Sequence, residues 1–83
     1  MENEKIDLIL NALNTIKEDE NIPRNVRAKI DCAICCLNDG EKEFSLKINS
    51  VLQELDEVSN DKNLPTYTKI EILNMIGVLG GYQ

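Results

Sequence analysis

The chain contains four stretches in which apolar residues recur every three or four positions, the spacing that marks one face of an α-helix. In the first stretch these residues are Ile6, Ile9, Leu10, Leu13 and Ile16. The other three stretches contain, in chain order, Val26, Ile30, Ala33, Ile34 and Leu37, then Phe44, Ile48, Val51, Leu52, Leu55 and Val58, and finally Ile72, Leu73, Met75, Ile76 and Leu79. No segment alternates apolar and polar residues with a period of two. The pattern therefore predicts four helices and no strands.

Short polar segments separate the four stretches. Pro23 and Pro65 follow two of them, and proline suits a first helical turn, where its missing N–H would have no partner. Gly40 follows the second stretch and is available for the left-handed conformation that often ends a helix. Gly80 and Gly81 close the fourth stretch. These signals predict where the helices begin and end.

The two halves of the chain resemble each other at an offset of 42 residues, the distance from Pro23 to Pro65. Any two amphipathic helices can be aligned through their Leu and Ile residues, so those matches alone prove little. The loop motif Asp-x-Asn-[Ile/Leu]-Pro, which also recurs at this offset, is more specific. We therefore predict one domain, 1–83, with an internal repeat of 4–40 and 44–80.

A period near 42 residues with two helices per unit falls in the range of HEAT and armadillo repeats. Such units stack their helix pairs around a shared core, and about three are usually needed. With two units, either the pairs fold onto each other or another chain covers an open face. The predicted fold is all-α, a four-helix bundle built from two HEAT-like helix–loop–helix units.

Two segments, 21–27 (Asn-Ile-Pro-Arg-Asn-Val-Arg) and 59–65 (Ser-Asn-Asp-Lys-Asn-Leu-Pro), are the most distinctive in the chain. Together with the chain length, they resemble a family of small archaeal proteins known as uncharacterised protein family one-four-seven. The resemblance covers nearly the whole chain. It implies an archaeal, cytosolic, helical protein and carries over no functional residues.

Length and charge narrow the possible functions. A chain of 83 residues builds only a thin core, with little room for an enclosed active site. Its net charge of −6 makes nucleic acid an unlikely partner, because binding phosphates needs clustered Lys and Arg. The chain has no apolar run of about 18 residues and no basic, apolar start. We therefore expect no membrane span and a cytoplasmic location.

Three cysteines, Cys32, Cys35 and Cys36, form the only match to a chemical motif. Zinc usually takes four ligands, and the chain has no His. The Cys-x-x-Cys pair also falls within a predicted helix, away from the N-terminus that would lower a thiol pKa. We interpret the three as packing residues. The alternative is a thiol- or metal-dependent regulator that uses them.

The remaining acidic and basic residues suggest no chemistry. Glu54, Asp56 and Glu57 flank an apolar stripe and are expected to face solvent. Arg27 and Asp31 lie four residues apart on the second helix and can pair. We predict no catalytic residues, no metal site and no cofactor.

The second and fourth helices carry apolar or small residues outside their core stripes. Either both helices are central and touch two neighbours each, or their outer faces form an interface. We predict the interface, used in a two-fold homodimer, with a further protein partner not identified. Its candidate residues are Ala28, Cys32, Cys35, Tyr67, Ile70 and Val78. The function predicted is that of a small non-catalytic module for protein–protein interaction or self-association.

Overall fold

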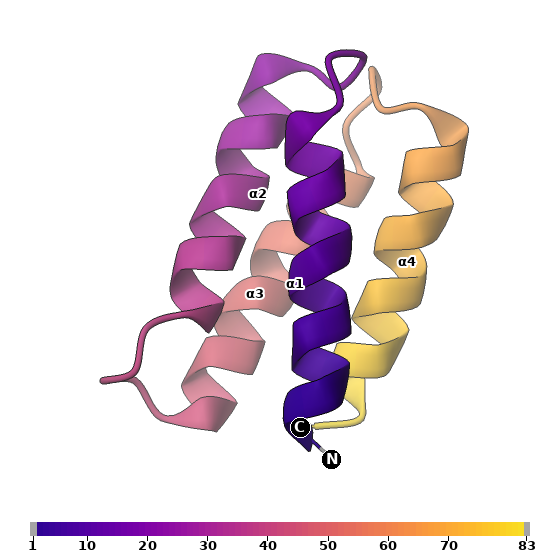
Figure 1. Cartoon of the computed structure of the whole chain (residues 1–83). Helices are drawn as coiled ribbons and strands as arrows, with labels where there is room; N and C mark the ends of the chain where they lie inside the picture. Colours follow the sequence, from indigo (N-terminus) through magenta and orange to yellow (C-terminus); the bar gives the residue numbers. More distant parts are fainter. Residues whose placement is uncertain (1, 83) are drawn as a thin grey trace.

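A computed structural model describes residues 2–82 of the chain. Helix α1 spans Glu2–Glu18, α2 spans Arg24–Leu37, α3 spans Phe44–Ser59 and α4 spans Thr66–Gly80 (Figure 1). The described residues contain no strand. All four predicted helices are present, and the predicted all-α class is confirmed.

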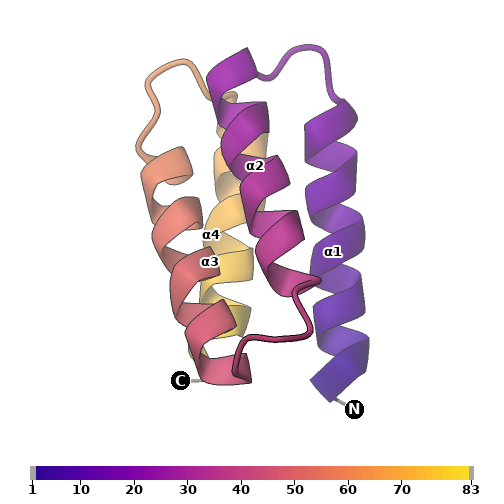
Figure 2. The same ribbon diagram turned by 90° about the vertical axis from the view of Figure 1, so that its left-hand side faces the viewer.

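Each helix packs mainly against the helices next to it in the chain, so α2 contacts α1 and α3, while α4 contacts α3. Two perpendicular views place α2 and α4 at opposite corners of the bundle, with α1 and α3 at the other two (Figures 1 and 2). The radius of gyration is 11.9 Å, close to the roughly 12 Å expected of a compact domain of this length. The second pair of helices therefore folds onto the first, and no open array forms.

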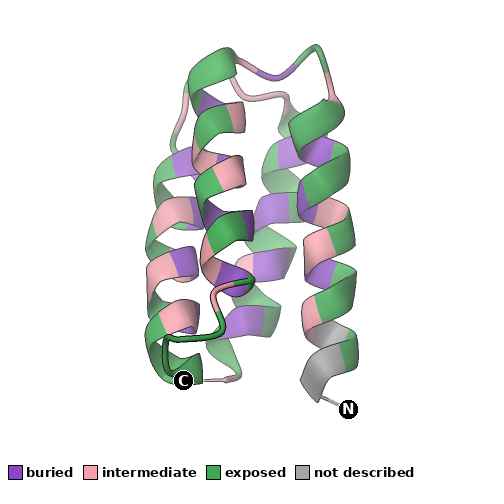
Figure 3. Ribbon diagram, turned by 60° about the vertical axis from the view of Figure 1, so that its left-hand side comes forward, coloured by how far each residue is buried: buried purple, intermediate pink, exposed green. Residues whose placement is uncertain are grey.

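The core is almost entirely aliphatic, and every helix contributes to it (Figure 3). Leu13, Ile30 and Leu55, one stripe residue from each of the first three helices, have no exposed surface. Ile22, in the loop between α1 and α2, is also buried and covers one end of the bundle. The aliphatic stripes read from the sequence thus meet in one core, as their spacing predicts.

Six predicted stripe residues are less buried than expected. Phe44 and Leu73 are exposed, and four others are only partly buried: Ile6, Leu10, Leu52 and Ile76. Phe44 begins α3 and packs edge-on against Tyr82, with ring centroids 5.4 Å apart. Leu73 and Ile76 are incompletely buried because α4 has only one extensive neighbour, α3. Only a narrow face of this very apolar helix is therefore covered.

All three loops use the same turn. The backbone N–H of Asn21 donates to Asp19 Oδ1 at 2.9 Å, and that of Asn63 donates to Asp61 Oδ1 at 2.8 Å. The middle loop repeats this bond between Glu41 and Asp39 at 3.0 Å, although it has neither the Asn nor the Pro of the motif. An aspartate that bonds the backbone two residues ahead closes a turn by itself.

The residue before each of the last three helices is extended, with ψ of 146°, 146° and 145°. The middle loop, which joins the two predicted repeats, has the same turn as the loop inside each repeat. The turn is therefore no evidence for an internal repeat. The internal repeat and the HEAT-like nature of its units stay predictions.

The expected left-handed cap at Gly40 is wrong. Neither Gly40 nor any other described glycine has a positive φ. Helix α2 ends instead at Asn38 with φ −87° and ψ −4°, and the N–H of Asp39 donates to the carbonyl of Cys36 at 3.2 Å. Tightening the last turn in this way satisfies the terminal carbonyls, so no residue has to enter the left-handed region.

Candidate interaction surfaces

All six residues predicted for an interface are exposed, but the structure does not gather them on one surface. Ala28, Cys32 and Cys35 lie on the outer face of α2, and Tyr67, Ile70 and Val78 lie on α4. Because α2 and α4 occupy opposite corners of the bundle, these two sets face away from each other (Figures 1 and 2). They form two separate candidate surfaces.

The three cysteines do not converge either. Cys32 and Cys35 are exposed, whereas Cys36 is partly buried and its thiol lies 3.9 Å from the carbonyl oxygen of Lys47 on α3. Within the described part of the chain, no three His, Cys, Asp or Glu side chains come together in a way that could hold a metal ion. The structure therefore supplies no further ligand to the Cys-x-x-Cys pair.

A groove lies between α1 and α4. Its volume is about 520 Å³, and its lining is mostly apolar: Leu8, Ile9, Ala12, Asn74, Met75, Gly77 and Val78. Ile9 and Met75 are buried and form its floor, whereas Leu8 and Val78 are 68% and 45% exposed and border it. The two helices run antiparallel here (Figure 1), so Leu8 in the first half of α1 and Val78 near the end of α4 line the same hollow.

Small residues on both helices leave the groove open where α1 and α4 pass each other. Ala12 offers only a methyl group, and a Cβ added to Gly77 would meet no atom within 4 Å. A second hollow of about 310 Å³ continues the groove between Thr15 and Glu71. Beyond it, the Tyr67 hydroxyl donates to Asp19 Oδ2 at 3.0 Å. This bond links the end of α1 to the start of α4, and the groove lies between the two helices on the side of the bond nearer the start of α1.

Sequence reasoning missed this groove. Two features of the sequence are consistent with it. Leu8 lies outside the core stripe of its helix, and Gly77 interrupts an apolar run in the fourth helix. Neither feature shows which helices become neighbours. Val78, which we predicted for an interface, does line the groove. Ile70 instead lies on the side of α4 directed away from the core.

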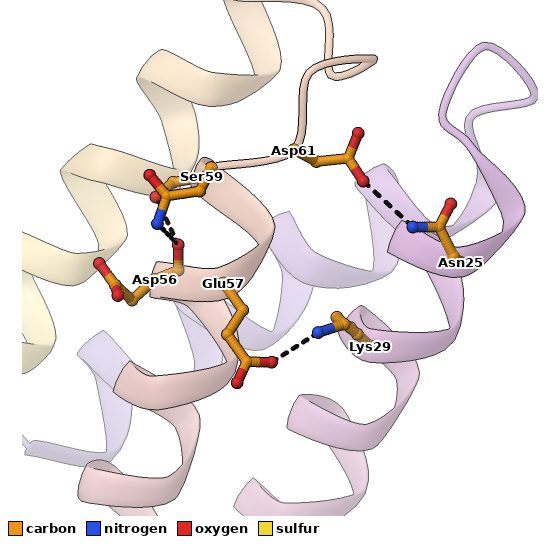
Figure 4. A network of polar contacts seen from close by, with 7 residues as sticks. Asn25, Lys29, Asp56, Glu57, Ser59 and Asp61 are labelled. Carbon is orange, nitrogen blue, oxygen red and sulfur yellow. Dashed lines mark hydrogen bonds and ion pairs between the residues drawn. The ribbon is translucent and has the colours of Figure 1, made fainter.

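Ion pairs fix α2 to both of its neighbours. Lys17 Nζ of α1 lies 2.7 Å from Asp31 Oδ1. Lys29 Nζ lies 2.5 Å from Glu57 Oε2 of α3 (Figure 4). Each lysine is hydrogen-bonded to its partner carboxylate, which raises its pKa above the ordinary value. Asn25 Nδ2 also donates to Asp61 Oδ2 at 3.1 Å. These contacts orient the helices and leave the groove untouched.

Asp31 pairs with Lys17 of α1 and not with Arg27, the residue four positions before it on α2. Lys17, on a neighbouring helix, reaches across to the carboxylate of Asp31. An i,i+4 spacing places two side chains on the same face of one helix but does not by itself bring their charged groups together. Among the acidic residues of α3, Asp56 and Glu57 are exposed as expected, while Glu54 is partly buried.

No described helix is both long and apolar enough to cross a membrane. The fold and its surfaces thus define a class: a small antiparallel four-helix protein with an apolar groove and exposed apolar side chains. Over residues 1–81 the sequence matches the group described as "Uncharacterised protein family (UPF0147)", and the chain belongs to this family.

Several archaeal UPF0147 proteins are similar to the chain over most of their length. The protein of Sulfurisphaera tokodaii is 34% identical over 75 residues, which cover 90% of this chain and 84% of the relative. That of Methanothermobacter thermautotrophicus is 29% identical over 79 residues, 95% of this chain and 78% of the relative. That of Pyrococcus furiosus is 32% identical over 77 residues, 92% of this chain and 83% of the relative. No solved structure matches the chain.

Proposed function

We propose that this chain is a non-catalytic module that works by protein–protein association, and that α4 is its principal contact helix. The observation that carries the proposal is the distribution of exposed apolar side chains. Helix α4 is one of four helices, yet it bears four of the seven large apolar side chains that are exposed among the described residues: Tyr67, Ile70, Leu73 and Val78. Clusters of this kind on a small protein mark interaction sites.

The first partner we propose is a second copy of the chain. Closed homodimers are commonly two-fold symmetric, so each copy contributes the same surface. The outer faces of α2 and α4 point in opposite directions, so a single two-fold interface can use only one of them. Helix α4 is the better candidate, because its outer residues are large and apolar, whereas those of α2 are Ala28, Cys32 and Cys35.

Sedimentation equilibrium at high-micromolar concentration tests this proposal. A dimer should have twice the 9.4 kDa mass of the chain. Ile70→Glu should then return the protein to a monomer without unfolding it, because Ile70 is 55% exposed. Leu46→Glu is the matched control, since Leu46 is equally exposed on α3. A 9.4 kDa species in the unmodified protein would refute self-association.

A further inference from the structure

The groove between α1 and α4 is long enough for two turns of another helix. It runs from the level of Leu8 to that of Thr15, and seven residues of α-helix rise roughly 10 Å. Two turns of another helix have the same length. Apolar side chains at positions i, i+4 and i+7 of such a helix would therefore reach from one end of the groove to the other.

The described charged side chains beside the groove are acidic. Glu71 is the one charged side chain among the described residues that line its two hollows. Glu4 is exposed one helical turn before Leu8, at the opposite end. The lysines whose side chains are described on these helices are directed elsewhere. Lys17 pairs with Asp31 of α2, and the helical period places Lys69 on the flank of α4 away from α1.

These charges decide between two occupants. A second copy would bring its own Glu71 and Glu4 to the interface and add a further net charge of −6. A cationic partner would instead meet acidic residues at both ends of an apolar floor. Electrostatic complementarity of this kind selects partners and speeds their encounter.

We propose that the α1–α4 groove binds a basic amphipathic helix of another protein. Three apolar side chains of that helix pack on Ile9, Ala12 and Met75 between the borders formed by Leu8 and Val78. Lys or Arg residues flank these anchors and face Glu4 at one end and Glu71 at the other. The inference rests on the proposed function in one respect only, that the chain acts through protein contacts. It concerns the side of α4 next to α1, which adjoins the surface around Ile70 and shares Val78 with it.

The probe is a synthetic 18-residue helical peptide with Leu at three anchor positions spaced i, i+4 and i+7 and with Lys at the flanking positions. A second peptide carries Glu in place of each Lys. Binding to the full chain is followed by NMR. The Lys peptide should shift the amide signals of Ala12, Met75 and Val78. The Glu peptide should bind at least about tenfold more weakly, and added salt should weaken the Lys peptide.

Two matched variants locate the site. Leu8→Lys should weaken the Lys peptide at least about tenfold, because it places a cation at the border of the groove. Leu46→Lys changes an exposed leucine in the same way on α3, at the opposite corner from α1, and should have no effect. Circular dichroism checks that both variants fold.

Three results would overturn the inference: no shifts with the Lys peptide, equal binding of the Glu peptide, or equal effects of the two Leu→Lys changes. The sedimentation experiment is independent of these results. If Ile70→Glu dissociates a dimer and the peptide does not bind the groove, the inference is refuted and the proposed function is supported. A monomer that binds the Lys peptide through the groove removes self-association and retains the inference.

Discussion

Truncating one apolar side chain at each of three depths tests the assignment of the core. Leu55 has no exposed surface, Ile76 is partly buried and Ile70 is 55% exposed. Removing a fully buried Leu costs about 2–5 kcal/mol, because the transfer free energy is lost and a cavity remains. A domain of 83 residues has a free energy of unfolding of roughly 4–12 kcal/mol. Leu55→Ala should therefore remove a large part of the stability.

The same change should cost less at the two other positions. Ile76→Ala should cost about 1–2 kcal/mol, because part of the side chain already contacts water and the space it leaves is open to solvent. Ile70→Ala should change the free energy of unfolding by no more than about 0.5 kcal/mol, as is usual for surface positions.

Urea denaturation followed by far-UV circular dichroism measures all three variants. It should be done at low micromolar concentration, so that self-association does not add to the stability. The chain has no Trp, which makes fluorescence a poor probe. An unchanged midpoint for Leu55→Ala, or a larger loss for Ile70→Ala than for Ile76→Ala, would show that the burial assigned to these helices is wrong.

Two further predictions concern α4 and the ion pairs. Gly77→Ala should raise the free energy of unfolding by about 0.5–1 kcal/mol, because alanine has a higher helix propensity than glycine and its Cβ would have no atom within 4 Å. Thermal unfolding should show a midpoint several degrees higher. A lower midpoint would contradict an open groove at this position. The hydrogen bond to Glu57 raises the pKa of Lys29 above 10.5, so the stabilisation is complete below that pH and is lost as the pH rises through the pKa in the folded state. Urea titrations should therefore find Lys29→Met less stable than the unmodified protein near pH 8, with the difference shrinking above pH 10.5. A difference that grows with pH would refute the pairing.

The sequence by itself determined the elements of this protein. The spacing of Ile9, Leu13 and Ile16, and of the corresponding residues in the later stretches, specified four helices and most of their buried faces. This works because a residue three or four positions away lies on the same side of a helix whatever surrounds it. The loops were equally local, since an aspartate closes each turn through its own neighbours.

The tertiary structure alone decided which faces meet. Nothing local to α4 distinguishes Ile72, which is buried, from Leu73, which is exposed, because the difference depends on where α3 lies. The same holds for Asp31, whose partner Lys17 is on another helix. The groove is the clearest case: Ala12 and Gly77 are 65 residues apart, and they create a hollow only because α1 and α4 pass side by side. A periodic pattern specifies how a helix divides its surface, whereas neighbours are chosen by the packing of the whole chain.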